Sequence, residues 1–137
     1  MNEPEALERL EAERVATFAT ITKAGWPHVV PITFAVVDGQ IVHMVDHKPK
    51  ESNELKRLAN VRLNPRASVL ADHYEDDWTQ LWWVRVDGAA IVVTRGTEWE
   101  TARVALAGKY HHYRERPPSG PAVLLKVDRI TYWDGSG

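Results

Sequence analysis

Strand-forming segments follow one another directly in the first third of this chain, with no helical segment between them. They are rich in β-branched and other apolar residues, and short turns separate them, Lys23-Ala24-Gly25 and Asp38-Gly39. Strands joined by such turns pair antiparallel, whereas a parallel sheet needs a crossover between successive strands. We therefore predict an α+β, mainly β fold built on a six-stranded antiparallel barrel. The expected strands are 15–22, 28–37, 40–46, 67–74, 81–94 and 122–133.

Three short helices should flank this barrel. Asn2 caps the first, which is expected over 3–14. The second begins at Ser52 and must stop near Asn64-Pro65, because proline disfavours helix in the residue before it. A capping box of Thr97 and Glu100 opens the third, which Gly108 can close.

Composition narrows the possible functions. The 137 residues suit one domain, 1–137, and the formal net charge of −2 predicts no general attraction to nucleic acid or to an anionic membrane. The chain contains no cysteine, which excludes disulfides, thiolate metal sites and thiol nucleophiles. Its first residues lack the pattern of a secretory signal, and we expect a cytoplasmic protein.

Pro31 stands in the middle of an otherwise regular strand pattern. Proline cannot donate a ladder hydrogen bond, so the strand should lie at a sheet edge, where neighbouring backbone groups stay free. The backbone around Val30, Ile32 and Thr33 could then bind the donor and acceptor edge of a flavin-like heterocycle. The alternative is an edge-strand proline that only guards against aggregation.

A small basic cluster follows the third expected strand. Lys48, Lys50 and Arg57 flank the start of the second expected helix, where free N–H groups also favour anions. The cluster predicts a phosphate site, although a solvated basic helix face is the alternative. We also place Val45 and Asp46, which immediately precede it, in the cofactor site.

Tryptophans are concentrated between residues 78 and 83. Strand alternation places Trp83 on the face opposite Val84 and beside Arg85, a composition typical of an interface or a ring-stacking wall. We therefore assign Trp78 and Trp83 to the wall of a cofactor pocket, the alternative being ordinary core and dimer packing. The histidines are scattered over separate elements and predict no metal site. No dinucleotide, phosphate-loop or hydrolase motif is present.

Several motifs together resemble one family. They are Ala19-Thr20-Ile21-x-x-x-Gly25-x-Pro27-His28-x-x-Pro31, Leu58-x-Asn60-x-x-x-Asn64-Pro65-Arg66-Ala67-Ser68 and Asp87-Gly88-Ala89-Ala90. This pattern resembles the pyridoxamine 5′-phosphate oxidase-like split β-barrel superfamily. Finer motifs resemble its actinobacterial branch that binds the deazaflavin coenzyme F420. They are Asp72-His73-Tyr74, Asp76-Asp77-Trp78, Leu81-Trp82-Trp83-Val84-Arg85 and Lys109-Tyr110-x-x-Tyr113.

The resemblance implies a split β-barrel, a homodimer with cofactor at the subunit interface, and hydride transfer between reduced F420 and a small organic acceptor. The family's cofactor-facing strand matches residues 30–33, and its basic residue falls on Arg57, where relatives usually carry lysine. Lys48 and Lys50 match its phosphate ligands in a loop that is longer here. No residue matches a catalytic acid. FMN is the alternative cofactor, and a non-enzymatic cofactor- or haem-binding protein is the alternative function.

Overall fold

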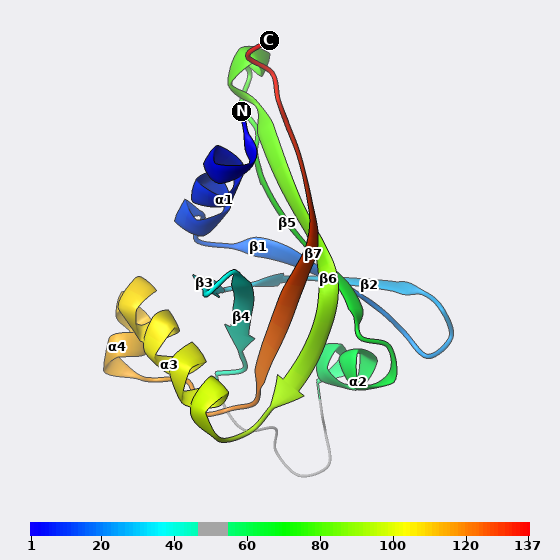
Figure 1. Ribbon diagram of the computed structural model, residues 1–137, viewed down its shortest axis with the longest axis vertical. Helices are drawn as coiled ribbons and strands as arrows, with labels where there is room; N and C mark the ends of the chain where they lie inside the picture. Colours follow the sequence, from blue (N-terminus) through cyan, green and yellow to red (C-terminus); the bar gives the residue numbers. More distant parts are fainter. Residues whose placement is uncertain (47–54) are drawn as a thin grey trace.

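The computed structural model describes residues 1–46 and 55–137 (Figure 1). The described helices and strands are α1 (Glu3–Ala12), β1 (Ala16–Ile21), β2 (Pro27–Ile32), β3 (Ala35–Val37), β4 (Gln40–Met44), α2 (Lys56–Leu63), β5 (Arg66–His73), the 3-10 helix η1 (Trp78–Gln80), β6 (Trp82–Val93), α3 (Thr97–Lys109), α4 (His111–Glu115) and β7 (Ala122–Asp134). The mainly β, α+β class is confirmed.

All the strands of the described residues form one antiparallel sheet, in the order β2-β1-β5-β6-β7-β4-β3. Its two edge strands, β2 and β3, follow each other in sequence and are separated only by Thr33 and Phe34, which we call the seam. Because the chain passes directly from one sheet edge to the other, the sheet must curl, as a split barrel does. Figure 1 shows this curl, with the long ribbon of β6 and β7 extending beyond it.

The expected number of strands was wrong. The sheet has seven strands rather than six, because the segment predicted as one strand over 28–37 divides at the seam into β2 and β3. The turn at Asp38-Gly39 is confirmed, since both residues have positive φ, 50° and 75°, as a tight hairpin turn requires. Gly88 marks a shift in register between β6 and β7, as a strand-interior glycine often does.

The helices also depart from expectation. The described residues contain four α-helices rather than three, because five-residue α4 has too short a periodic pattern to predict. The capping box at Thr97 was wrong: Gly96 is the N-cap of α3, and no side chain caps this helix. Residue Ser52, the expected start of the second helix, lies outside the described residues. None of the described helices has both the length and the apolar character needed to cross a bilayer.

Two apolar clusters hold the fold together. In the first, Leu10 of α1 and Leu58 of α2 pack on Phe18 and on Val84 and Val86 of β6. In the second, α3 and α4 pack on β3, β4 and β7, with Met44, Leu106 and Leu124 buried. Full burial of side chains of this size contributes about 1.5–3 kcal/mol each relative to exposure. Ile41 and Leu125 of the first cluster alternate along β4 and β7 with Val42 and Leu124 of the second, so the clusters lie on opposite faces of the sheet. Helices α1 and α2 cover the inner face, and α3 and α4 cover the other face at β3, β4 and β7.

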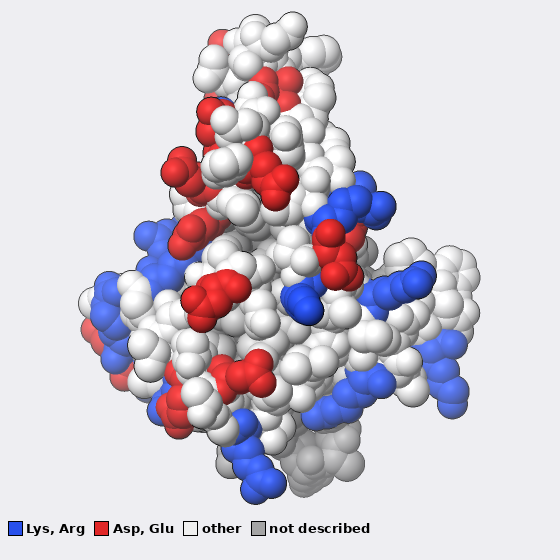
Figure 2. Space-filling model, viewed as in Figure 1, with Lys and Arg blue, Asp and Glu red and all other residues white. Residues whose placement is uncertain are grey.

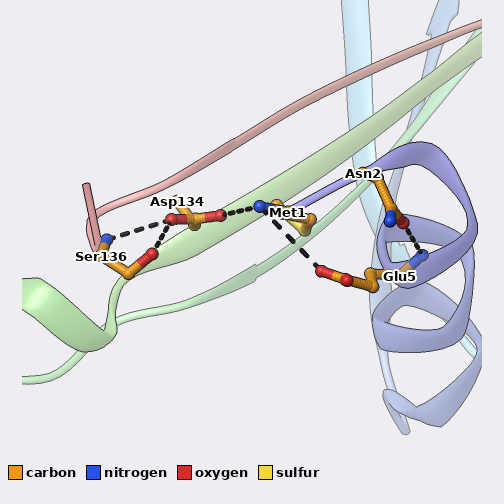
Figure 3. A network of polar contacts seen from close by, with 5 residues as sticks. All are labelled: Met1, Asn2, Glu5, Asp134 and Ser136. Atoms are coloured by element: carbon orange, nitrogen blue, oxygen red, sulfur yellow. Dashed lines mark hydrogen bonds and ion pairs between the residues drawn. The ribbon is translucent and has the colours of Figure 1, made fainter.

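A polar network joins the beginning of α1 to the end of β7 (Figure 3). The Asn2 side chain caps α1 by accepting a 2.9 Å hydrogen bond from the Glu5 backbone nitrogen, as predicted. The Met1 amino group lies 2.9 Å from the Asp134 carboxylate. Hydrogen bonding by Ser136, and then by the Met1 amino group, holds the pKa of Asp134 well below its usual range.

Candidate functional site

A polar pocket of about 380 Å³ opens beside the seam. It lies at the ends of β2 and β4, beside the first turn of α2 and beside Tyr113 of α4. The residues around it are Pro31, Ile32, Thr33, His43, Met44, Val45, Asp46, Leu55, Arg57 and Tyr113. Strand, helix and seam residues that are far apart in sequence therefore form one cavity, which we call the seam pocket.

The backbone of the seam is bound by side chains instead of by a neighbouring strand. The Thr33 carbonyl lies 2.9 Å from Nδ1 of His43, and the Phe34 N–H donates a 3.0 Å bond to the Tyr110 hydroxyl. Buried backbone groups without partners are costly, so a chain that leaves one sheet edge for the other needs such substitutes. These contacts fix the wall of the pocket next to Pro31.

Tyr113 connects the seam to the end of β4. Its hydroxyl donates to Oδ1 of Asp46 at 2.7 Å and lies 2.8 Å from Oγ1 of Thr33. Burial raises the pKa of Tyr113 to about 12, and the nearby Asp46 carboxylate contributes in the same direction. The tyrosine is therefore a neutral hydrogen-bond donor at physiological pH.

His43 and Arg57 form a hydrogen-bonded pair at the wall of the pocket. Nη1 of Arg57 lies 2.8 Å from Nε2 of His43, whose ring is almost completely buried. Burial lowers the pKa of His43 to about 4, and burial also lowers the pKa of Arg57. At neutral pH the imidazole is thus uncharged, and Arg57 supplies the positive charge.

The structure brings most of the predicted cofactor residues together. Pro31, Ile32, Thr33, Val45, Asp46 and Arg57 all line the seam pocket. Pro31 lies on the edge strand β2, as predicted, and is exposed. Val30 does not line the pocket, because its side chain packs against the inner apolar cluster. Lys48 and Lys50 lie outside the described residues.

The two predicted tryptophans are not at this pocket. Trp83 lines a second cavity of about 410 Å³, together with Trp133, Tyr74 and Arg85. Trp78 is on η1 and 68% exposed. Both lie near the far end of the β6–β7 ribbon, away from α2 (Figure 1). Within one chain they do not wall the seam pocket.

Sequence reasoning missed two functional candidates, His43 and Tyr113. His43 carried a usable signal, because a histidine inside the apolar run of β4 must find partners when it is buried. Tyr113 stood in a motif of the resemblance, yet its role depends on α4, which the sequence did not predict. The described residues contain no group of three or more His, Cys, Asp or Glu side chains placed to hold a metal ion.

Fold and pocket together define an antiparallel split-barrel protein with a polar cavity at the junction of its two edge strands. The sequence model of the pyridoxamine 5′-phosphate oxidase family matches residues 3–134. The chain belongs to this family.

Solved structures show the same fold. A conserved hypothetical protein from Mycobacterium tuberculosis has a TM-score of 0.81 and 25% identity, and the match covers 98% of this chain and 86% of that one. A heme binding protein from Mycobacterium smegmatis has a TM-score of 0.77 and 24% identity, covering 97% of this chain and 54% of that one.

An FAD-binding protein from Mesorhizobium loti has a TM-score of 0.73 and 22% identity, and the match covers 96% of this chain and 94% of that one. The likenesses to the heme binding and FAD-binding proteins show the fold alone. Among curated proteins, no sequence matches this chain significantly.

Proposed function

We propose that this protein is an oxidoreductase that transfers a hydride between reduced F420 and a small organic acceptor, with the cofactor held in the seam pocket. The observation that carries the proposal is the convergence of six predicted cofactor residues around that one cavity. Pro31 and Arg57 are the two residues that the resemblance matches most directly. They line this cavity from two different elements, β2 and α2.

The chemistry of the pocket residues fits a flavin-type or deazaflavin-type cofactor. Arg57 can bind a phosphate, since its guanidinium is planar and always charged. The backbone beside Pro31 is at a sheet edge and can bind the polar edge of a heterocycle. When bound, such a cofactor supplies the hydride chemistry, and the protein supplies orientation and shielding from water.

Arg57 lies on the more basic side of the molecule. Figure 2 shows Lys and Arg side chains on the side of α2 and the β1–β2 hairpin, and Asp and Glu side chains toward α1 and the two termini. An anionic ligand is therefore favoured at the α2 end over the opposite end.

F420 is proposed over FMN because of the finer motifs, which include Tyr110 and Tyr113 at the seam. Two similar structures are described as binding FAD and heme, which supports cofactor binding by this fold in general. A heme carrier receives less support from the pocket, because the Nε2 lone pair of His43 is engaged by Arg57.

We further propose that the protein works as a homodimer. The outer face of the sheet carries Val29, Leu70, Trp83 and Trp133, while the described helices α1 and α2 pack into the cluster on the inner face. Val29 is 59% and Trp133 47% exposed, and an apolar surface of this kind is typical of an interface. A partner subunit docked here could bring its Trp78 and Trp83 toward the acceptor site.

The proposal is tested by titrating the purified protein with F420, with FMN and with heme at fixed ionic strength, following tryptophan fluorescence. Tight binding of F420, with Arg57→Ala weakening it by about tenfold or more and the exposed-site control Arg95→Ala leaving it unchanged, would support the proposal. Preference for FMN would assign the protein to flavin chemistry. Binding of heme alone, or of nothing, would refute it.

A further inference from the structure

His43 lines the seam pocket, although no cofactor motif includes it. It lies on β4, is 5% exposed, and its ring centroid is 6.4 Å from that of Phe18. Nδ1 lies 2.9 Å from the Thr33 carbonyl oxygen, and Nε2 lies 2.8 Å from Nη1 of Arg57. Each ring nitrogen therefore has one partner, and the two partners belong to different elements.

These partners determine the protonation of the ring. A carbonyl oxygen only accepts hydrogen bonds and a guanidinium only donates them, so Nδ1 must carry the hydrogen and Nε2 must be the acceptor. A protonated imidazole would direct a second N–H at the guanidinium and break this arrangement. The contacts are consistent only with a neutral imidazole in one tautomer.

A neutral partner has a specific consequence for Arg57. A carboxylate would also orient a guanidinium, but it would cancel the positive charge in the low-dielectric interior. An imidazole lone pair orients the group without adding a negative charge to that of Asp46, the carboxylate that already acts on Arg57. The link also ties Arg57 to the backbone of the seam, because the same ring donates to the Thr33 carbonyl.

Resting on the function proposed above, we propose that His43 is a positioning residue for ligand binding. Its neutral ring connects the Thr33 carbonyl to Arg57 and so aims the guanidinium at a phosphate or another anionic group in the seam pocket, without adding a second negative charge to that of Asp46. His43 acts through Arg57, and what it contributes is an acceptor that carries no charge.

The first test examines the link without any cofactor. Nitrogen-15 NMR of the imidazole should show a protonated Nδ1 and an unprotonated Nε2, and the ring should stay neutral well below the ordinary pKa of about 6.5. Arg57→Ala should shift the Nε2 signal, whereas Arg95→Ala should not. An Nε2–H tautomer, or titration near the ordinary value, would overturn the proposal.

The second test measures binding of F420 and FMN to four variants whose folding is checked by thermal melting. His43→Leu removes the acceptor and should weaken binding about tenfold, whereas His43→Gln keeps a neutral acceptor and should stay within about threefold. His43→Glu should also weaken binding, because its charge neutralises Arg57. The control His111→Leu, on the exposed side of α4, should bind as the wild type does.

The outcomes separate this inference from the proposed function. Equal binding by His43→Leu and the wild type, or equal losses for His43→Leu and His43→Gln, would overturn the positioning role.

If the wild type binds neither cofactor, the proposed function fails. Inorganic phosphate then replaces the cofactors, with the Arg57 Nε–H signal as readout. A phosphate response in the wild type that disappears in His43→Leu would support the inference, and an unchanged response would overturn it.

Discussion

The hydroxyl of Tyr110 lies 3.0 Å from both the backbone nitrogen and the backbone oxygen of Phe34. The same hydroxyl is 2.9 Å from the Arg14 carbonyl, so its single hydrogen serves one of the two oxygens at a time. One side chain from the end of α3 thus replaces the strand partner that the seam lacks. It also joins the seam to the segment after α1.

We expect Tyr110→Phe to destabilise the protein by about 1–3 kcal/mol, because it leaves the Phe34 N–H without its partner at a partly buried site. The free energy of unfolding in urea measures this effect. Tyr74→Phe is the matched control, since Tyr74 is 69% exposed, and should change stability by only a few tenths of a kcal/mol. Equal stabilities for both variants would contradict the role of Tyr110 at the seam.

Gly88→Ala should be strongly destabilising. A Cβ at this position would lie 1.9 Å from the Lys126 carbonyl oxygen, which belongs to the neighbouring strand β7 and cannot move without disturbing the ladder. We expect a loss of at least about 2 kcal/mol, comparable to severe overpacking. Gly108→Ala, inside α3 with open space around its Cβ, should instead be neutral or stabilise by up to about 1 kcal/mol. Urea denaturation of the two variants distinguishes them, and a tolerated Gly88→Ala would show that β7 can move.

Acid should weaken the fold through His43. Its pKa falls from about 6.5 to about 4 on folding, so between these values the unfolded chain binds a proton that the folded protein does not. The contribution of neutral His43 to the free energy of unfolding is therefore fully present above pH 6.5 and is lost as the pH drops toward 4. The free energy of unfolding should fall by about 3 kcal/mol over this pH range, since each unit of pKa difference between the folded and unfolded chain corresponds to about 1.36 kcal/mol.

Urea denaturation at a series of pH values should show this slope in the wild type, and His43→Gln should lack it. The groups facing the ring are the Thr33 carbonyl, Arg57 and Asp46, and the Asp46 carboxylate opposes the shift. Identical slopes in both proteins would assign the acid sensitivity to other groups.

Lys109 presents a buried amino group whose Nζ has no hydrogen-bond partner among the described residues and lies 3.8 Å from the centre of the Phe34 ring. Burial lowers the pKa of Lys109 to about 8, so the folded protein disfavours the charged form of this side chain. We expect Lys109→Met to be more stable than the wild type at pH 7. The advantage should shrink as the pH rises through about 8 toward the ordinary lysine value near 10.5, because the folded protein then holds neutral lysine. Melting temperatures at pH 7 and pH 9.5 test this, and a less stable variant at pH 7 would mean that the cation–π contact dominates.

Trp83→Ala should weaken the proposed dimer without unfolding the subunit, because Trp83 is on the outer sheet face beside Trp133. Sedimentation velocity across a dilution series should show a higher dissociation constant for this variant. Tyr132→Ala, on the neighbouring residue of β7 that alternates to the other face, is the control. A protein that sediments as a monomer at all concentrations would refute the homodimer proposal.

Local sequence patterns were sufficient to predict several strands and turns of this protein. The missing backbone N–H of Pro31 predicted an edge strand. Alternation placed Val84 and Val86 on the face opposite Trp83, and both are buried, because a strand exposes its two faces in turn. The dipeptide Asp38-Gly39 predicted the hairpin turn at these two positions, since few other residues accept the required positive φ. Local patterns together with the family resemblance placed Pro31, Thr33 and Arg57 in one expected cofactor site, and all three residues line the seam pocket.

Only the tertiary structure decided how the apolar segment 28–37 is divided. Nothing in its pattern distinguishes one long strand from two, because the break at Thr33 and Phe34 depends on which sheet edge each half can pair with. The partners that make the break tolerable, His43, Tyr110 and Tyr113, are contributed by β4 and by the region of α3 and α4. Tyr110 and Tyr113 lie 76 and 80 residues from the seam residues that they bind, and hydrogen bonds over such distances leave no local periodicity. The sequence could signal that a buried His43 needs partners, but only the folded chain shows that these are Thr33 and Arg57.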